Sequence, residues 1–186
     1  MKTELISCLP EHPETWDYAI EKASAYIVSG ELVAIPTETV YGLAGSALYS
    51  TAAEKIYAAK GRPSDNPLIV HVANPTDADK YAYPTPLFYT LAECFMPKRS
   101  VIPDTVSGGL DTVAIRCPSH PIAHRLIEVS GHPIAAPSAN RSGKPSCTTA
   151  AHVYEDLAGK IPLILDGGIC DIGVESTVIS VEDDRC

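Results

Sequence analysis

The chain has 186 residues, of which 45% are hydrophobic and 20% are charged. This length and composition predict one globular domain and exclude a disordered segment or two full domains. The 14 basic and 23 acidic residues give a formal net charge of −9, which excludes a generally basic nucleic-acid-binding protein. The apolar runs are shorter than the ~18–20 residues of a transmembrane helix. Six cysteines without Cys-x-x-Cys spacing, and no secretory leader, favour reduced thiols and a cytoplasmic protein.

The first part of the chain alternates patterns typical of helices and strands. Trp16, Ile20 and Ala23 recur at helical spacing. Thr51 and Glu54 have the spacing of a capping box at the start of a second helix. The predicted elements are a helix over residues 13–29, a strand over 32–35, a helix over 51–60 and a strand over 68–72.

A third helix is predicted over residues 86–95. Thr85 is a suitable N-cap, and Pro86 is favoured at the first helical position. Phe88, Leu91 and Phe95 would share one face, which predicts that this face packs on the core.

The second part of the chain continues the alternation of strands and helices. The predicted elements are a strand over 112–116, a helix over 121–130 ended by Gly131, a strand over 133–136, a helix capped by Thr148 or Thr149 and closed by Gly159, and strands over 163–165 and 176–181. Interleaving of this kind favours an α/β fold, in which one mixed sheet is packed with helices.

Polar segments follow several of the apolar strands, at the place where open α/β sheets bind their ligands. The first segment, residues 36–43, follows the strand over 32–35. Its threonine hydroxyls suit a polar ligand, and Gly42 permits close approach of the backbone. An ordinary threonine-rich turn is the alternative interpretation.

A second polar segment covers residues 60–67 and combines two cations with an asparagine. Arg62 is suited to a phosphate as a planar fork and Lys60 as a point charge. The alternative for Lys60 is an interaction with the helix dipole at a helix C-terminus. In an acidic chain such a cluster is informative, and we interpret the cations as gathered around one cavity, with the acidic residues on the outer surface.

A third polar segment covers residues 136–148 and lies just before a predicted helix. Its small hydroxyl residues, Asn140 and two cations suit an anion near a helix N-terminus. A solvated loop is the alternative. The phosphate loop Gly-x-x-x-x-Gly-Lys-Ser/Thr, the motif Gly-x-Gly-x-x-Gly, the zinc motif His-Glu-x-x-His and the nucleophile elbow Gly-x-Ser-x-Gly are all absent from the sequence.

Two polar side chains interrupt the predicted strands. Arg116 ends an apolar run and needs an anionic partner if it is buried. That partner is either a structural carboxylate, such as Glu175, or the carboxylate of a ligand. His71 is either a core histidine with satisfied hydrogen bonds or a ligand contact.

These segments, together with residues 173–177, resemble the YrdC-like family of threonylcarbamoyl-AMP synthases over about residues 30–181. The resemblance implies a single twisted α/β sheet with a concave ligand cavity. It also implies a nucleotidyltransferase that joins L-threonine, bicarbonate and ATP, accompanied by Mg²⁺, into threonylcarbamoyl-AMP and pyrophosphate. A partner transferase would use this product to modify the tRNA adenosine next to the anticodon.

The resemblance also assigns site residues. Lys60 and Arg62 would act in catalysis by neutralising phosphate charge, and no residue is assigned as a metal ligand. The ATP side would comprise Lys60, Arg62, Asn66, Thr112, Asn140, Ser146 and Thr148. The threonine side would comprise Thr39, His71, Arg116, Ser138 and Ser176.

The sequence departs from the family pattern in two places. A short segment expected after Pro97 is missing, and the C-terminal continuation that contributes to the ATP site is absent. We therefore expect residues 1–186 to form one YrdC-like domain that lacks these two parts. Two alternatives to the synthase remain: a carbamoyl-adenylate-forming domain, and a module of the same fold that binds double-stranded RNA or takes part in ribosome maturation, for which weak RNA binding is expected.

Overall fold

A computed structural model of the chain describes residues 1–9, 11, 13–90 and 93–180. The strands are β1 (Glu4–Ser7), β2 (Val33–Ile35), β3 (Gly42–Ser46), β4 (Ile69–His71), β5 (Glu93–Pro97), β6 (Thr112–Arg116), β7 (Ile134–Ala135), β8 (Leu163–Asp166) and β9 (Ile179–Ser180). The helices are α1 (Trp16–Val28), α2 (Ser50–Lys60), α3 (Asp104–Ser107), α4 (Pro121–Ser130) and α5 (Ala150–Leu157), with 3-10 helices η1 (Pro13–Thr15), η2 (Pro75–Lys80) and η3 (Pro86–Thr90).

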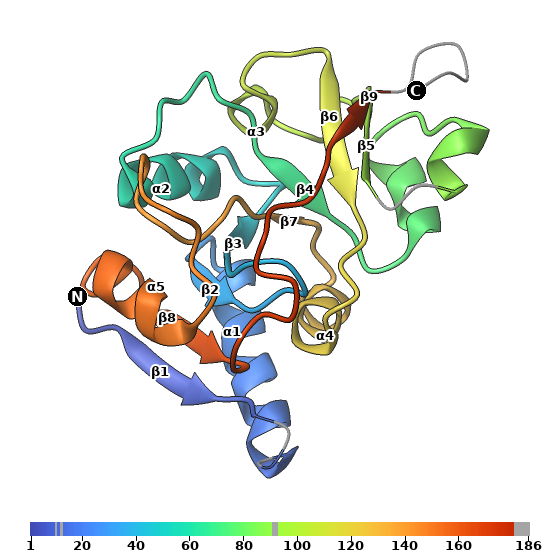
Figure 1. The fold of residues 1–186 in the computed structure, drawn as a ribbon. Coiled ribbons are helices and arrows are strands. Elements are labelled where there is room, and N and C mark those ends of the chain that lie inside the picture. Colours follow the sequence, from blue (N-terminus) through green and yellow to red (C-terminus); the bar gives the residue numbers. More distant parts are fainter. Residues whose placement is uncertain (10, 12, 91–92, 181–186) are drawn as a thin grey trace.

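The strands of the described residues form one nine-stranded sheet in the order β1-β8-β2-β3-β7-β4-β6-β5-β9 (Figure 1). Four neighbouring pairs are parallel: β1–β8, β8–β2, β4–β6 and β5–β9. The other four, β2–β3, β3–β7, β7–β4 and β6–β5, are antiparallel. The predicted α/β class with a mixed sheet is therefore confirmed.

Helices cover both faces of the sheet. Successive residues of a strand point to opposite faces, so Leu163 and Leu165 of β8 pack in one core cluster and Ile164 in the other. The helices α1 and α4 cover the first face, where Ile27 and Leu126 are buried. The helices α2 and α5 cover the second face. Burial on both faces explains why the strands read as continuous apolar runs.

The helix predicted over 121–130 is confirmed with its bounds, since α4 spans Pro121–Ser130 and Gly131 follows with a φ of +65°. The helix predicted over 51–60 is present as α2, but the predicted capping box of Thr51 and Glu54 is wrong. The helix α2 begins at Ser50, and its N-cap, Tyr49, makes no side-chain capping bond.

The helix predicted over 86–95 is wrong in its second half. Residues 86–90 form the 3-10 helix η3, Leu91 and Ala92 lie outside the described residues, and Glu93–Pro97 form the strand β5. All five residues of β5 pair with β6 in antiparallel register. The hydrogen bonds to β6 come from a distant part of the sequence, which local helical spacing does not reveal.

Two further strands, in addition to β5, were not predicted. The strand β1 is short, lies at the sheet edge and is partly exposed. The strand β3 contains Gly42 and Gly45, and glycine is depleted in strands. At Gly45 the glycine permits close packing, because an added Cβ would lie 3.0 Å from Leu32 Cδ2. The strand predicted over 176–181 is reduced to β9, and Val181 lies outside the described residues.

None of the helices in the described part of the chain has the length and apolar character to span a bilayer. Cys8, Cys117, Cys147 and Cys170 are free thiols.

Candidate functional site

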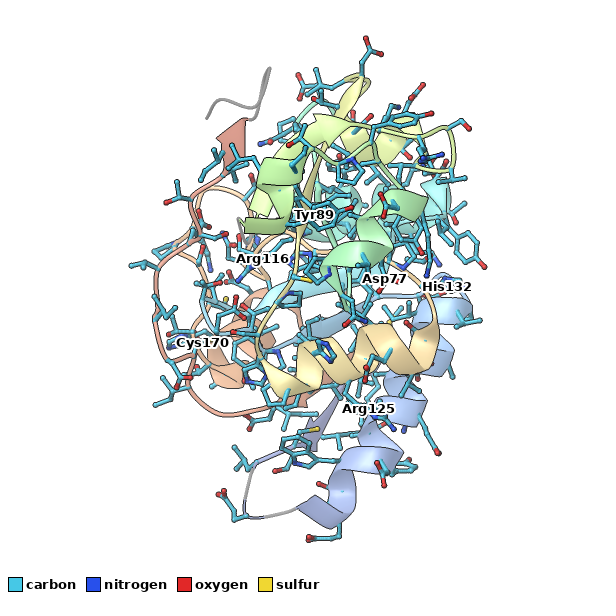
Figure 2. The ribbon with its side chains drawn as sticks, turned by 90° about the vertical axis from the view of Figure 1, so that its right-hand side faces the viewer. Asp77, Tyr89, Arg116, Arg125, His132 and Cys170 are labelled. Atoms are coloured by element: carbon cyan, nitrogen blue, oxygen red, sulfur yellow. The ribbon has the colours of Figure 1, made fainter. Side chains whose placement is uncertain are left out.

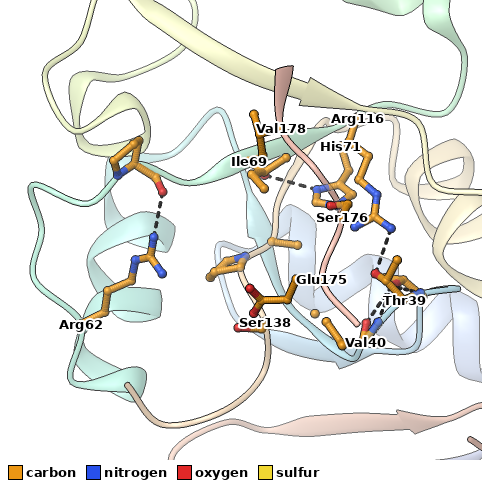
Figure 3. A pocket seen from close by; sticks show the side chains of 15 residues that line it. Thr39, Val40, Arg62, Ile69, His71, Arg116, Ser138, Glu175, Ser176 and Val178 are labelled. Atoms are coloured by element: carbon orange, nitrogen blue, oxygen red, sulfur yellow. Dashed lines mark hydrogen bonds between the residues drawn. The ribbon is translucent and has the colours of Figure 1, made fainter. Parts of the chain in front are cut away.

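A pocket of about 200 Å³ lies where loops leave the middle strands of the sheet (Figure 3). Its walls come from the turn between β2 and β3, the loop between α2 and β4, the strand β4, the end of β6, the residues after β7 and a segment that precedes β9. The residues that line it are Thr37, Thr39, Val40, Gly42, Arg62, Pro67, Ile69, His71, Arg116, Ala136, Pro137, Ser138, Glu175, Ser176 and Val178.

Arg116 lies at the end of β6 and is buried, with 8% of its surface exposed. Its Nη2 atom donates to Glu38 Oε1 and to Thr39 Oγ1, the latter at 3.0 Å. Within the described part of the chain, its Nε and Nη1 atoms have no hydrogen-bond partner. Because Arg116 also lines the pocket, this guanidinium retains donors for an anionic group there.

Glu38 accepts a hydrogen bond from Arg116, and two backbone amides hold the Glu38 carboxylate in place. Its Oε2 atom accepts from the amides of Ser119 and His120, at 3.2 and 3.3 Å. Burial by itself raises the pKa of the Glu38 carboxyl, but backbone hydrogen bonds and the bond from Arg116 lower it below its ordinary value. The expectation of a structural carboxylate for Arg116 is therefore met, but its example, Glu175, is wrong, because the partner is Glu38. The turn between β2 and β3 brings Glu38 to the end of β6 instead.

The threonines of this turn organise its backbone. Thr37 Oγ1 donates to the carbonyl of Val40 at 2.7 Å and accepts from the amide of Val40 at 3.3 Å. It also lies 3.1 Å from Thr39 Oγ1. These bonds direct the Thr39 hydroxyl toward Arg116 and the pocket, so the turn does more than reverse the chain.

His71 fits both interpretations of its position, because it is buried and lines the pocket. Its Nδ1 atom lies 3.2 Å from the carbonyl of Ile69, which fits a proton on Nδ1 because a carbonyl can only accept. Burial, together with the charge of Arg116, lowers the pKa of His71 to about 4. The imidazole is therefore neutral at neutral pH.

Lys60 ends α2 and lies behind the pocket wall, with 3% of its surface exposed. Its ammonium group donates to the carbonyl of Ser138, to the carbonyl of Asn140 at 2.6 Å and to Asn140 Oδ1 at 3.3 Å. Burial, followed by the charge of Arg62, lowers its pKa to about 8. Lys60 thus fixes the loop that follows β7.

Arg62 lines the opposite side of the pocket from Arg116 (Figure 3). Asn66 positions it, because Arg62 Nη2 donates to Asn66 Oδ1 at 2.5 Å and to the carbonyl of Pro67 at 3.0 Å. The Nη1 atom has no hydrogen-bond partner among the described residues. Two guanidinium groups therefore face one pocket, which suits a ligand with an anionic group at each end.

The loop after β7 is held by further side chains outside the pocket. Asn140 Nδ2 donates to the carbonyls of Arg141 and Lys144, at 2.9 and 2.6 Å. Asp156 of α5 accepts from the amide of Arg141 at 3.0 Å and from Lys144 Nζ at 2.5 Å. The Lys144 ammonium group is thus paired with a carboxylate of the same chain. Hydrogen bonds and this ion pair hold the loop after β7 in place.

The segment over residues 167–178 connects β8 to β9 (Figure 1). Its residues Glu175, Ser176 and Val178 line the pocket. The amides of Ile172 and Gly173 donate to the carbonyls of Glu38 and Thr39, each at 3.0 Å. Ser146 Oγ donates to Glu175 Oε1 at 2.5 Å. These bonds join the segment over residues 167–178 to two other walls of the pocket.

The predicted site residues divide into two groups. The five assigned to threonine, and also Arg62, line the pocket: Thr39, His71, Arg116, Ser138 and Ser176. The other residues assigned to ATP lie outside the lining: Lys60, Asn66, Thr112, Asn140, Ser146 and Thr148. The first residue of β6, Thr112, is at the opposite end of that strand from Arg116. The carbonyl of Thr148 accepts from the amide of Cys170 at 3.0 Å.

Two acidic residues at the pocket, Glu38, which contacts Arg116, and Glu175, which lines the pocket, were not assigned from the sequence. Glu38 lies within the recognised segment 36–43, but its pairing with Arg116 joins residues that are 78 positions apart in the sequence, so no local signal reveals it. Glu175 was considered only as a structural partner for Arg116. Its position in the pocket depends on the path of residues 167–178, which no local pattern reveals.

The chain resembles known proteins over nearly its whole length. The family model Sua5/YciO/YrdC, described as "Telomere recombination", matches residues 25–186. The Threonylcarbamoyl-AMP synthase of Pyrococcus abyssi is 51% identical over 93% of this chain and 53% of its own. That of Bacillus subtilis is 52% identical over 91% of this chain and 52% of its own. The chain thus spans about half the length of these relatives.

A solved structure agrees with these similarities. The crystal structure of P. abyssi Sua5 complexed with L-threonine matches with a TM-score of 0.91 and 48% identity. The match covers 96% of this chain and 54% of that one.

Proposed function

Since the chain belongs to the Sua5/YciO/YrdC family, we propose that it forms threonylcarbamoyl-AMP and pyrophosphate from L-threonine, bicarbonate and ATP. The synthases that resemble it, and the threonine complex of P. abyssi Sua5, support this reaction. The observation that carries the proposal is the pair of guanidinium groups, Arg116 and Arg62, on opposite sides of one pocket. An amino acid and a nucleotide would each bring one anionic group to such a pocket.

Threonine would bind at the end that contains Arg116. The free donors of the guanidinium suit the α-carboxylate, and Glu38 fixes their direction. The hydroxyls of Thr39, Ser138 and Ser176 offer acceptors and donors for the amino and hydroxyl groups. His71 is neutral, so it adds no positive charge that would repel the amino group.

The reaction would proceed in two steps without a protein nucleophile. The threonine nitrogen attacks the carbon of bicarbonate, whose hydroxyl group leaves as water with a proton from the nitrogen, or it attacks carbon dioxide that bicarbonate has formed by losing water and then gives up a proton. Either route yields a carbamate. A carbamate oxygen then attacks the α-phosphorus of ATP, and the bond between the α-phosphorus and the pyrophosphate oxygen breaks. The chain would contribute orientation of the reactants and neutralisation of phosphate charge.

ATP would bind on the side that contains Arg62. The Arg62 guanidinium would contact the phosphates, and Lys60 would act through the loop that its ammonium holds. Asn66 would act by positioning Arg62, and Asn140 by shaping the same loop. Ser146, Thr148 and Thr112 would complete the nucleotide side. Mg²⁺ would arrive with ATP as part of the substrate.

We extend the proposal to the setting of the reaction. Residues 1–186 would act as one domain in the cytoplasm, and a tRNA-modifying transferase would consume the product. The resemblance of the polar segments to the YrdC-like family supports the single domain and the transferase, and the cysteines without Cys-x-x-Cys spacing favour the cytoplasm.

Release of pyrophosphate tests this function. We expect release that requires ATP, threonine and bicarbonate together, and none when any one is omitted. Arg116→Met should abolish it, whereas Arg125→Met on the exposed side of α4 should not. Release of pyrophosphate without threonine, or salt-sensitive binding of double-stranded RNA without any release, would contradict the proposal.

A further inference from the structure

Glu175 places a negative charge in a pocket that otherwise suits anions. Of the described residues that line the pocket, it is the only acidic one. Figure 3 shows its carboxylate pointing into the pocket, between Arg62 on one side and the group of Thr39 and Arg116 on the other. A triphosphate drawn to Arg62 would therefore meet this carboxylate.

The Glu175 carboxylate is held in place by one of its two oxygens. Oε1 accepts from Ser146 Oγ at 2.5 Å, and Ser146 belongs to the loop before α5. Among the described residues, Oε2 has no hydrogen-bond partner. One oxygen is thus fixed, and the other is free for a ligand.

The surroundings of Glu175 are positively charged. Burial lowers the pKa values of Lys60 and Arg62 below their ordinary values. The negative charge of Glu175 acts in the opposite direction on both and offsets part of this lowering. The carboxylate is therefore close to the two cations that phosphates would need. A bare triphosphate must either displace it or be joined to it by a cation, because like charges repel in such a setting.

The donors present fit a divalent cation that a nucleotide carries. Carboxylate and hydroxyl oxygens are the ligands that Mg²⁺ prefers, and Mg²⁺ usually binds one or two protein carboxylates together with substrate phosphates. Within the described residues, no group of three or more His, Cys, Asp or Glu side chains forms a metal site. The chain thus offers a single carboxylate, which is enough only if phosphates supply the other ligands.

We propose that Glu175 binds the Mg²⁺ ion of Mg·ATP, with its free oxygen directed at the metal and Ser146 holding the other oxygen. The inference rests on the proposed function and adds a residue for recognition of the metal-bound form of the nucleotide. It also gives the segment over residues 167–178 a role in sensing the nucleotide, since Glu175 lies within it.

Calorimetric titration of the whole chain tests this inference. ATP is titrated in excess MgCl₂ and, separately, in EDTA, with the unchanged protein and with Glu175→Gln. The unchanged protein should prefer Mg·ATP. The glutamine retains an acceptor for Ser146 but loses the charge, so the preference should fall by about tenfold, the effect typical of a lost metal-site interaction. Asp171→Asn, which removes an exposed charge from the same segment, should leave the preference unchanged.

The other outcomes are decisive. If Glu175→Gln binds both forms of ATP more tightly by the same factor, the carboxylate only occupies the place of an anion, and the inference is wrong. It is also wrong if the preference for Mg·ATP is unchanged. Failure of the unchanged protein to bind ATP in either condition would instead overturn the proposed function, and the inference with it.

Discussion

At the scale of single residues, the guanidinium of Arg116 depends on Glu38 for its direction. The ion pair between them is buried at the end of β6, and two backbone amides fix the carboxylate. Both acceptors of Arg116, Glu38 and Thr39, lie on the turn between β2 and β3. This turn therefore sets the position of a cation that another strand carries.

We expect Arg116→Lys to raise the KM for threonine by roughly 10- to 100-fold and to leave the KM for ATP nearly unchanged. A lysine ammonium cannot form a two-pronged contact with a carboxylate and reach Glu38 as well. Loss of one charge-assisted hydrogen bond costs about 1.5–3 kcal/mol.

Steady-state kinetics with each substrate varied in turn measure this effect. Arg125→Lys is the matched control, because Arg116 and Arg125 lie on opposite sides of α4 (Figure 2). An unchanged KM for both substrates in Arg116→Lys would remove the carboxylate contact from the mechanism.

The lowered pKa of Lys60 predicts that the rate of pyrophosphate release depends on pH. Its pKa is lowered from 10.5 to about 8, so its ammonium loses a proton as the pH rises through about 8. The contacts to Ser138 and Asn140 then weaken, and we expect the rate of pyrophosphate release to fall above pH 8. The pKa of His71, about 4, is too low to contribute in this range.

The free energy of unfolding should rise over the pH range in which the rate of pyrophosphate release falls. Between about pH 8 and 10.5 the unfolded chain retains the proton that the folded chain has lost, so the contribution of Lys60 to stability rises with pH. Rates and thermal unfolding at pH 7–9.5 measure both effects. Both should vanish in Lys60→Met and persist in Lys55→Met, a change at a half-buried lysine of the same helix that pairs with Glu31 away from the pocket. A constant rate up to pH 9.5 would refute the assignment.

At the scale of elements, the end of β8 is held in close contact with two other elements. A Cβ atom at Gly167 would lie 2.6 Å from Pro36 Cγ, just after β2, and 2.9 Å from Ile122 Cδ1 in α4. The Tyr41 hydroxyl also accepts from the amide of Gly167 at 3.2 Å and donates to the carbonyl of Gly168 at 2.8 Å. The segment over residues 167–178 thus leaves the sheet in a fixed direction.

We expect Gly167→Ala to lower the free energy of unfolding by about 1–3 kcal/mol, the usual cost of overpacking. Gly42→Ala is the control, because its Cβ would meet Ala136 Cβ at an ordinary 3.4 Å. Denaturant unfolding of both variants measures the difference. If Gly167→Ala proves as stable as Gly42→Ala, the end of β8 has room to move.

The helices and strands differ in how well local sequence signals could predict them. Local signals fix α4, where Pro121 begins the helix, Gly131 follows it and an apolar face lies between. The strand β5 has no such signal, because its state is decided by pairing with β6. For the site, His71 and Arg116 lie at the ends of β4 and β6, where the sequence pattern already marked them, whereas the full set assigned to threonine came from the family resemblance. The partner of Arg116 was not predictable, since it depends on how two distant turns meet.

At the scale of the whole molecule, the positive charges are spread more widely than the sequence suggested. Lys22, Lys55, Lys80 and Lys98 pair with carboxylates at 2.8 Å or less, and none of them lines the pocket. The interpretation that the cations gather around one cavity was therefore only partly right. Lys60, Arg62 and Arg116 do form such a group.

The order of the strands in the sheet has a consequence for synthesis of the chain on the ribosome. β1 precedes the other described strands in the sequence, and among them it pairs with β8 alone, in a register that joins Glu4 to Leu163. The pocket likewise receives its last wall from residues 175–178. A growing chain must therefore extend at least to residue 163 before β1 can pair with β8, so a premature stop before residue 163 leaves β1 without this neighbour and the pocket open on one side.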